Sequence, residues 1–274
     1  YGKSFISRTL GRIFLHGLAK WPLTSWIFGK LQQRKASKKK VVPFINLYNV
    51  DTSEFLEPVD SFSSFNAFFI RKLKPSVRPL AEGDNRAIIP ADARYYFYET
   101  VDEKFPFSVK GQNFTLKTLL QDDEKAARYT GGTLVIARLC PTDCHRFYFP
   151  CDSVPGTTKY INGKLFSVNP IAIQDNPWIY CVNRRCVTYL ESNQFGTIAY
   201  LEIGATSVGS IIQTFTAHTL QKKGAEKGYF SFGSALLLLF EKGRVRLDAD
   251  LVAATKQDLE MRALIGQPLG IAIR

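Results

Sequence analysis

The first forty residues combine apolar positions at helical spacing with basic side chains. Apolar residues recur at that spacing over residues 5–18, and Arg8 and Arg12 lie one turn apart on another face of the wheel. A second apolar segment, residues 26–31, leads into a basic tract at 34–40. The pattern predicts two basic amphipathic helices.

The pattern changes from helices to strands past residue 70. Pro75 and Pro79 break the helical pattern, because proline disfavours helix at its own position and in the residue before it. One further helix is expected at 116–127. Short alternating or β-branched runs, bounded by Gly, Pro, Asn or Asp, predict strands at 94–100, 133–139, 196–203, 207–215 and 230–240. We expect an α+β fold, with N-terminal amphipathic helices in a region spanning 1–70 and a mostly antiparallel β-rich domain at 71–274.

The net charge of +12 is concentrated in the N-terminal segment. Residues 1–40 hold ten of the 36 Lys and Arg and no acid, which leaves 26 basic and 24 acidic residues in the rest. Tryptophan and phenylalanine beside these cations are typical of a helix that lies on an anionic membrane surface. Nucleic acid is the weaker alternative, because no reading motif accompanies the charges. No run of 18 apolar residues is present, so we expect peripheral association.

The cysteines argue against a disulfide framework and a metal site. Five cysteines are an odd number, which suits a reducing compartment. The spacings Cys140-x-x-x-Cys144 and Cys181-x-x-x-x-Cys186 differ from the C-x-x-C knuckle of common zinc sites. We therefore expect free thiols and no bound metal.

Three polar residues in apolar surroundings are candidates for chemistry. His145 follows a predicted strand and could act as a general base. Asp92 is flanked by apolar residues, which is costly for a carboxylate without a partner. Ser234 follows Gly233 and precedes an apolar run. Taken singly, each residue is more often structural: a core histidine, a turn aspartate and a strand serine.

Taken together, these residues stand in motifs that resemble those of the phosphatidylserine decarboxylases. The resemblance covers most of residues 60–270 as an ordered series. The motifs are SFNAFFIRKLKPSVRP, IIPADA, LCPTDCHRFYFP, INGKLFSVNP, FGTIAYLEIGATSVGSI, KKGAEKGYFSFGS and IGQPLG. Seven motifs in family order, at similar intervals, are far more specific than any one of them.

The resemblance implies a self-cleaving, pyruvoyl-dependent enzyme. Cleavage between Gly233 and Ser234 would give a β chain ending at 233 and a 41-residue α chain, 234–274, and would convert Ser234 into the pyruvoyl cofactor. The resemblance makes Asp92 the orienting acid and associates His145 with decarboxylation. A Schiff base between the pyruvoyl group and phosphatidylserine would then lose CO2 and release phosphatidylethanolamine.

The family also implies a location and an assembly. We expect a peripheral protein on the cytoplasmic face of a bacterial-type cell membrane. Its α and β chains should stay bound to each other, and a homodimer is compatible with the resemblance.

Three positions depart from the family pattern. Tyr148 stands where the family has a second histidine, the one associated with activating the serine; Ala93 replaces a glycine, and Ala235 replaces Thr or Ser. A tyrosine, with an ordinary pKa of ~10, is a poor base at neutral pH. The base for cleavage would then be His145 or a residue elsewhere. Two alternatives stay open: an uncleaved, inactive homologue that binds anionic phospholipid, and a pyruvoyl enzyme with another amino-acid substrate.

Overall fold

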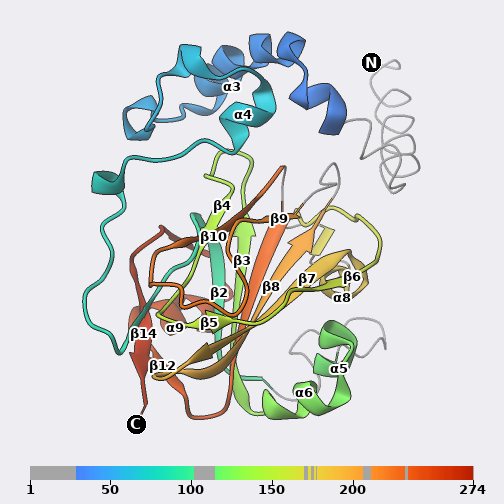
Figure 1. The fold of residues 1–274 in the computed structure, drawn as a ribbon, viewed down its shortest axis with the longest axis vertical. Coiled ribbons are helices and arrows are strands. Elements are labelled where there is room, and N and C mark those ends of the chain that lie inside the picture. Colours follow the sequence, from blue (N-terminus) through green and yellow to red (C-terminus); the bar gives the residue numbers. More distant parts are fainter. Residues whose placement is uncertain are drawn as a thin grey trace.

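The computed structural model describes residues 29–101, 115–169, 172–173, 176, 178–205, 211–231 and 234–273. A helical cap, residues 29–73, lies across one end of a β-rich core, and an extended segment joins the two (Figure 1). The predicted α+β fold, with N-terminal helices and a mostly antiparallel core, is confirmed. The first predicted amphipathic helix lies outside the described residues.

The cap is made of short helical pieces. They are a turn at 29–33, the 3-10 helix η1 (Lys35–Lys40), α3 (Val41–Tyr48), the 3-10 helices η2 (Thr52–Glu54) and η3 (Val59–Ser61), and α4 (Phe65–Phe69). Their small core packs the rings of Phe55, Phe62 and Phe68 with centroids 5.8 to 6.1 Å apart. Ser64 starts α4, because its hydroxyl accepts a hydrogen bond from the Ala67 backbone N–H.

The core is built on one eight-stranded antiparallel sheet. Its order is β13 (Met261–Ala263), β2 (Ala93–Val101), β3 (Gly132–Leu139), β11 (Ser234–Phe240), β8 (Gly196–Gly204), β7 (Arg185–Ser192) and β5 (Val154–Pro155), and β6 (Lys159–Ile161) also pairs with β7. The central position of β11 explains its apolar composition, since all seven of its residues are buried.

Both faces of this sheet are covered. On the first face, the alternate β11 residues Leu236, Leu238 and Phe240 join one apolar cluster. On the second face, Ala235, Leu237 and Leu239 join another, which includes residues of α5 (Leu116–Leu120), α6 (Asp123–Arg128) and α8 (Ile179–Val182). A strand buried on both faces has a continuous apolar run instead of an alternating one.

Two three-stranded sheets and α9 (Ala249–Lys256) contribute to the cluster on the first face. One sheet has the order β1 (Arg86–Ile88), β14 (Pro268–Ala272) and β12 (Val245–Leu247). The other has the order β4 (Arg146–Tyr148), β10 (Glu226–Phe230) and β9 (Ile211–Gln213). The candidate residues lie where β4 and β10 meet the large sheet.

Two predicted elements are wrong in detail. The single strand predicted at 230–240 is two strands in different sheets, because β10 ends at Phe230 and β11 begins at Ser234. The helix predicted at 116–127 is divided at Gln121, which has a φ of 48°, and Asp122 caps the second piece. Of the strand predicted at 207–215, β9 covers residues 211–213, and residues 206–210 lie outside the described residues.

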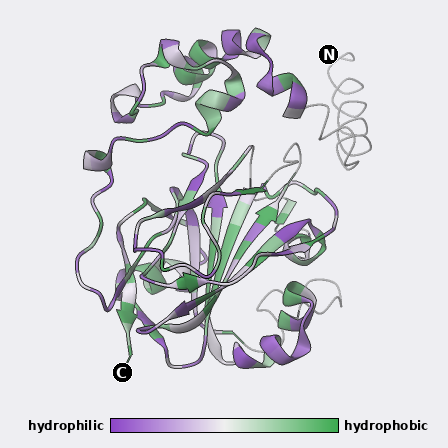
Figure 2. Ribbon diagram, in the orientation of Figure 1, coloured by the Kyte–Doolittle hydropathy of each residue, from purple (hydrophilic) through white to green (hydrophobic). Residues whose placement is uncertain are grey.

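The distribution of hydropathy differs between the two parts of the molecule. Hydrophobic residues run along the strands of the large sheet, whereas the cap mixes hydrophobic and hydrophilic residues along each helix (Figure 2). Within the described ranges, no helix has the length and apolar composition needed to cross a bilayer.

Candidate active site

Ser234 is the first residue of the central strand. It pairs with Leu139 of β3 on one side and with Gly204 of β8 on the other. The side chain is fully buried, and its Oγ has no hydrogen-bond partner among the described residues. A buried hydroxyl without a partner costs ~1–3 kcal/mol, so this serine is not in place to stabilise the fold. Gly233 lies outside the described residues.

His145 is also fully buried and also has a free polar atom. Its ring packs on the ring of Phe69 in the cap, with centroids 3.9 Å apart. Nδ1 lies 3.0 Å from the carbonyl oxygen of Asp143, which favours the tautomer with the proton on Nδ1. Burial lowers the pKa of His145 to about 3, so the imidazole is neutral. Nε2 has no partner in the described part of the chain and carries a lone pair.

Backbone pairing brings Ser234 and His145 into the same corner of the molecule. Ser234 lies opposite Leu139, and the chain runs from Leu139 through a short loop to His145. The carbonyl of His145 accepts a hydrogen bond of 2.9 Å from the backbone N–H of Phe230, four residues before Ser234. These two backbone contacts therefore hold the segments that carry Ser234 and His145 near each other.

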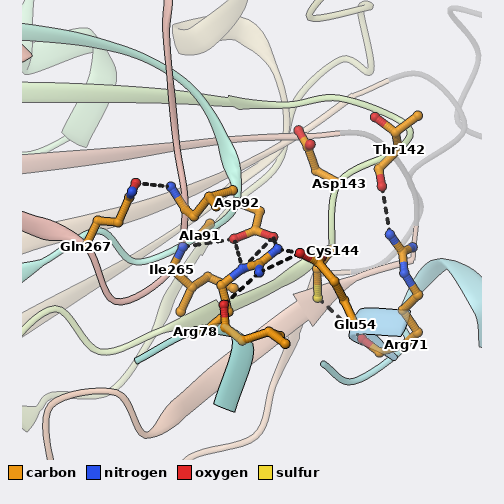
Figure 3. A network of polar contacts seen from close by, with 12 residues as sticks. Glu54, Arg71, Arg78, Ala91, Asp92, Thr142, Asp143, Cys144, Ile265 and Gln267 are labelled. Carbon is orange, nitrogen blue, oxygen red and sulfur yellow. Dashed lines mark hydrogen bonds and ion pairs between the residues drawn. The ribbon is translucent and has the colours of Figure 1, made fainter. Parts of the chain in front are cut away.

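Asp92 is buried and has both an ion-pair partner and a backbone partner. Its carboxylate accepts hydrogen bonds from Nε and Nη2 of Arg78, at 2.8 to 3.2 Å, and from the backbone N–H of Ile265 at 2.9 Å (Figure 3). Arg78, directly after the 3-10 helix η4 (Pro75–Val77), also binds Glu54. Burial alone would lower the pKa of Arg78, but the hydrogen bonds to both carboxylates outweigh burial and raise it. Among the described residues Asp92 has no hydrogen bond to His145, so its role as orienting acid stays a prediction.

Tyr148, at the end of β4, has an environment that disfavours the phenolate a base would need. Its backbone N–H donates to the carbonyl of Pro90, two residues before Asp92. Burial raises the pKa of its hydroxyl above the ordinary value, so the phenol stays protonated at neutral pH. His218 is exposed, and its Nε2 lies 3.1 Å from the hydroxyl of Thr157. Within the described ranges, His145 is therefore the imidazole that can serve this corner.

The other two departures from the family pattern lie in well-packed strands. Ala93 begins β2, is buried and pairs with Ala263 of β13. Ala235 is buried on the second face of the large sheet. Both positions are packed around a small side chain.

A buried ion pair close to Ser234 was missed from the sequence. Lys227 of β10 donates to Glu202 of β8 at 2.5 Å, to Gln213 at 2.9 Å and to Thr188 at 3.1 Å. Both charged side chains are fully buried. The signal was present in the sequence, because Glu202 stands in the apolar run Thr197 to Ile203, where a carboxylate needs a buried partner. Glu202 lies two residues before Gly204, the neighbour of Ser234.

The described residues contain no group of three His, Cys, Asp or Glu that could hold a metal ion. All five cysteines are free thiols, and Cys144, Cys151 and Cys186 are buried.

Comparisons of the sequence with known proteins identify the family of this chain. The family model for phosphatidylserine decarboxylase matches residues 65–270, which include Asp92, His145 and Ser234. The chain is 45% identical over 262 residues to the phosphatidylserine decarboxylase proenzyme of Chlamydia pneumoniae, covering 95% of this chain and 87% of that protein. It is 44% identical over 269 residues to that of Chlamydia muridarum and 40% identical over 269 residues to that of Chlamydia trachomatis serovar D, covering 98% of this chain and 89% of each relative. The chain thus belongs to the phosphatidylserine decarboxylase family.

Proposed function

We propose that this chain is a membrane-associated decarboxylase that converts phosphatidylserine to phosphatidylethanolamine and CO2, using a pyruvoyl group that it makes from Ser234. Family membership supports the decarboxylase activity, and the relatives are named as proenzymes, which supports activation by cleavage. The observation that carries the proposal is the buried Oγ of Ser234, which has no partner in the described part of the chain.

This hydroxyl fits the role of an internal nucleophile. Attack of Oγ on the carbonyl carbon of residue 233 would break the peptide C–N bond and form an ester, with the amine of residue 234 set free. Removal of the α-proton would then expel the carboxylate of residue 233 and leave dehydroalanine at position 234. Addition of water and loss of ammonia complete a pyruvoyl group at the new chain end. A serine hydrogen-bonded to its surroundings would have to give up that bond before reacting.

His145 is the base that the corner offers. Its imidazole is neutral, its Nδ1 proton is held by the Asp143 carbonyl, and the lone pair on Nε2 is free to accept a proton. We assign His145 to accept the proton of the Ser234 hydroxyl transiently during cleavage and to relay a proton to the product carbon during decarboxylation. When present, the pyruvoyl group supplies an electrophilic carbonyl that takes up the electrons left by departing CO2.

The cap supports peripheral binding to an anionic membrane, and the cytoplasmic face is the side that we expect from the family resemblance. Leu47 is 72% exposed and Val42 is 51% exposed on α3, directly after the lysines at 38–40 of η1. Exposed apolar side chains beside cations suit an interface of lipid headgroups, and each cation near the surface contributes ~1 kcal/mol. Because Phe69 of the cap packs on His145, a lipid bound at the cap would have its headgroup near the corner.

Mass spectrometry of the purified protein tests the proposal most directly. We expect two chains, and the smaller should begin at a blocked residue 234 that borohydride reduces. Incubation with phosphatidylserine vesicles should release CO2 and phosphatidylethanolamine. A single intact chain without decarboxylase activity would instead identify an uncleaved lipid-binding homologue and overturn the proposal.

A further inference from the structure

A cavity of about 240 Å³ lies between the cap and β4. Its lining includes three cations, Arg71, Lys72 and Arg146, and one carboxylate, that of Glu57. The hydroxyl-bearing Ser61 and Ser63 also line it. A phosphate group fits this volume, since a water molecule takes up ~30 Å³ in the liquid. The cavity is thus basic, polar and of suitable size for an oxyanion.

Arg71 is a buried cation whose hydrogen bonds are incomplete. The residue is 4% exposed, and its Nη2 donates to the carbonyl of Thr142 at 2.7 Å (Figure 3). The guanidinium lies 4.8 Å from the ring centroids of Phe55 and Phe68. Nε has no hydrogen-bond partner, and no carboxylate lies within ion-pair distance in the described part of the chain. A buried charge without an opposite charge is costly, which favours an anion that completes the site.

The other two cations differ in how far they are neutralised. Arg146 donates to Glu226 at 2.6 Å and to the carbonyl of Ile70 at 2.9 Å, so its charge is already paired. Lys72 is exposed at the cavity and forms no ion pair with the residues described. Arg71 and Lys72 are therefore the two charges that remain for a ligand.

The cavity lies next to the corner of Ser234 and His145, and residues of both the cap and the core connect the two. Arg146 directly follows His145, and Phe69, two residues before Arg71, packs on the His145 ring. The thiol of Cys144 also donates to the carbonyl of Arg71 at 3.3 Å. In the phosphatidylserine headgroup, a methylene and an ester oxygen are all that separate phosphorus from the α-carbon. A site for the phosphate must therefore lie beside the site of decarboxylation.

We propose that this cavity binds the phosphodiester of the phospholipid headgroup, with Arg71 and Lys72 as its charged contacts. The inference rests on the proposed function for the identity of the lipid. Arginine and lysine are the side chains that bind phosphate oxygens best, and the planar fork of arginine adds directional hydrogen bonds. The same chemistry would also accept free phosphate, so the test separates the two sources.

Binding is measured first, on the uncleaved full chain carrying Ser234→Ala, by calorimetry with glycerophospho-L-serine. The variant Lys72→Gln should weaken this binding about tenfold, since it removes one charge-assisted contact. Arg71→Lys keeps the charge and loses the fork, and should also weaken binding. The matched control is Lys74→Gln, an exposed lysine directly after the cap and outside the cavity lining that donates to the Ser53 carbonyl; it should bind as the parent does. Equal affinity for the parent and for Lys72→Gln would overturn the site.

Kinetics of the cleaved enzyme then show whether the phosphate that the cavity binds is that of the lipid headgroup or free phosphate. Lys72→Gln should raise KM about tenfold for short-chain phosphatidylserine, with little change in kcat, and leave the phosphate-free substrate O-hexanoyl-L-serine unaffected. Binding of inorganic phosphate that glycerophospho-L-serine does not displace would overturn the assignment to the headgroup. A wild-type protein that decarboxylates neither substrate would instead refute the proposed function, while the calorimetry would still report on the cavity.

Discussion

Two buried polar clusters lie on the first face of the large sheet, and they differ in how fully their hydrogen bonds are formed. Lys227 donates to three side chains, and its ammonium lies within 6 Å of three aromatic rings. The corner of Ser234 and His145 is equally buried, yet Oγ and Nε2 have no partners among the described residues. The first cluster can stabilise the fold, whereas the second retains atoms for chemistry. A buried polar group is therefore informative about function when its bonding is incomplete.

The largest expected effect comes from removing the free hydroxyl. Ser234→Ala should abolish cleavage completely, because no other atom can form the ester, and should leave the free energy of unfolding unchanged or higher. The matched control is Ser153→Ala, a buried serine whose hydroxyl donates to the carbonyl of Cys151. It should lose ~1 kcal/mol of stability and still be cleaved. Denaturant titration and mass spectrometry measure both quantities, and cleavage of Ser234→Ala would contradict the proposed chemistry.

Breaking the Lys227 cluster, whose hydrogen bonds are fully formed, should instead destabilise the fold. Lys227→Met leaves Glu202 buried without a cation, which should cost ~3–5 kcal/mol of stability in the uncleaved Ser234→Ala background. Adding Glu202→Gln should recover most of the loss. The surface change Lys222→Met, at an exposed pair with Asp152, should leave the unfolding curve where it is. If Lys227→Met is as stable as its parent, the ion pair is not structural.

The neutral state of His145 predicts a pH dependence of stability. The unfolded imidazole titrates near 6.5, whereas burial lowers the pKa in the folded protein to about 3. Between these values the unfolded chain binds a proton that the folded chain does not. Stability is therefore complete above pH 6.5 and falls as the pH drops towards 3, by up to ~1.4 kcal/mol per pH unit.

The experiment is urea denaturation from pH 7.5 to 4 in the uncleaved Ser234→Ala background. His145→Gln should flatten the profile, and the exposed His218→Gln should not change it. An unchanged slope in His145→Gln would show that another group controls the loss of stability.

The smallest effect should come from Tyr148. Because burial keeps its hydroxyl protonated, Tyr148→Phe should be cleaved within about twofold of the wild-type rate. Tyr148→His places an imidazole at this position. Where the wild type is cleaved slowly, this variant should be cleaved faster. The fraction of intact chain over time, followed by gel electrophoresis, measures both. A large loss in Tyr148→Phe would show that the phenol takes part after all.

The sequence predicted elements well where the pattern is local. The strands at 94–100, 133–139 and 196–203 agree with β2, β3 and β8 within a residue or two, because alternating or β-branched runs report directly on a sheet. Local surroundings marked Ser234, Asp92 and His145 as candidates, and the family resemblance joined them into one site with assigned roles. The break between β10 and β11 was not predicted, since it depends on strands that pair with segments far along the chain.

A local sequence pattern also could not predict which residues contact Asp92, Lys227 and His145. Arg78 lies 14 residues from Asp92, and Glu202 lies 25 residues from Lys227, so neither pair shares a helix face or a strand. Phe69 reaches His145 from the cap. Such contacts depend on how separate elements dock, which periodicity does not encode. An isolated charge in an apolar run does indicate a buried partner, but it does not indicate which residue that partner is.

The central position of β11 has a consequence for the lifetime of the cleaved protein. Strands β11 to β14 all follow residue 233, and three of them pair with the preceding chain: β11 with β3 and β8, β13 with β2, and β14 with β1. Before cleavage, folding is unimolecular. After the proposed cleavage, any molecule that unfolds would release two fragments, and recovery would become a second-order encounter that slows on dilution. The working enzyme would therefore persist through slow unfolding, with its durability set by a rate and not by an equilibrium.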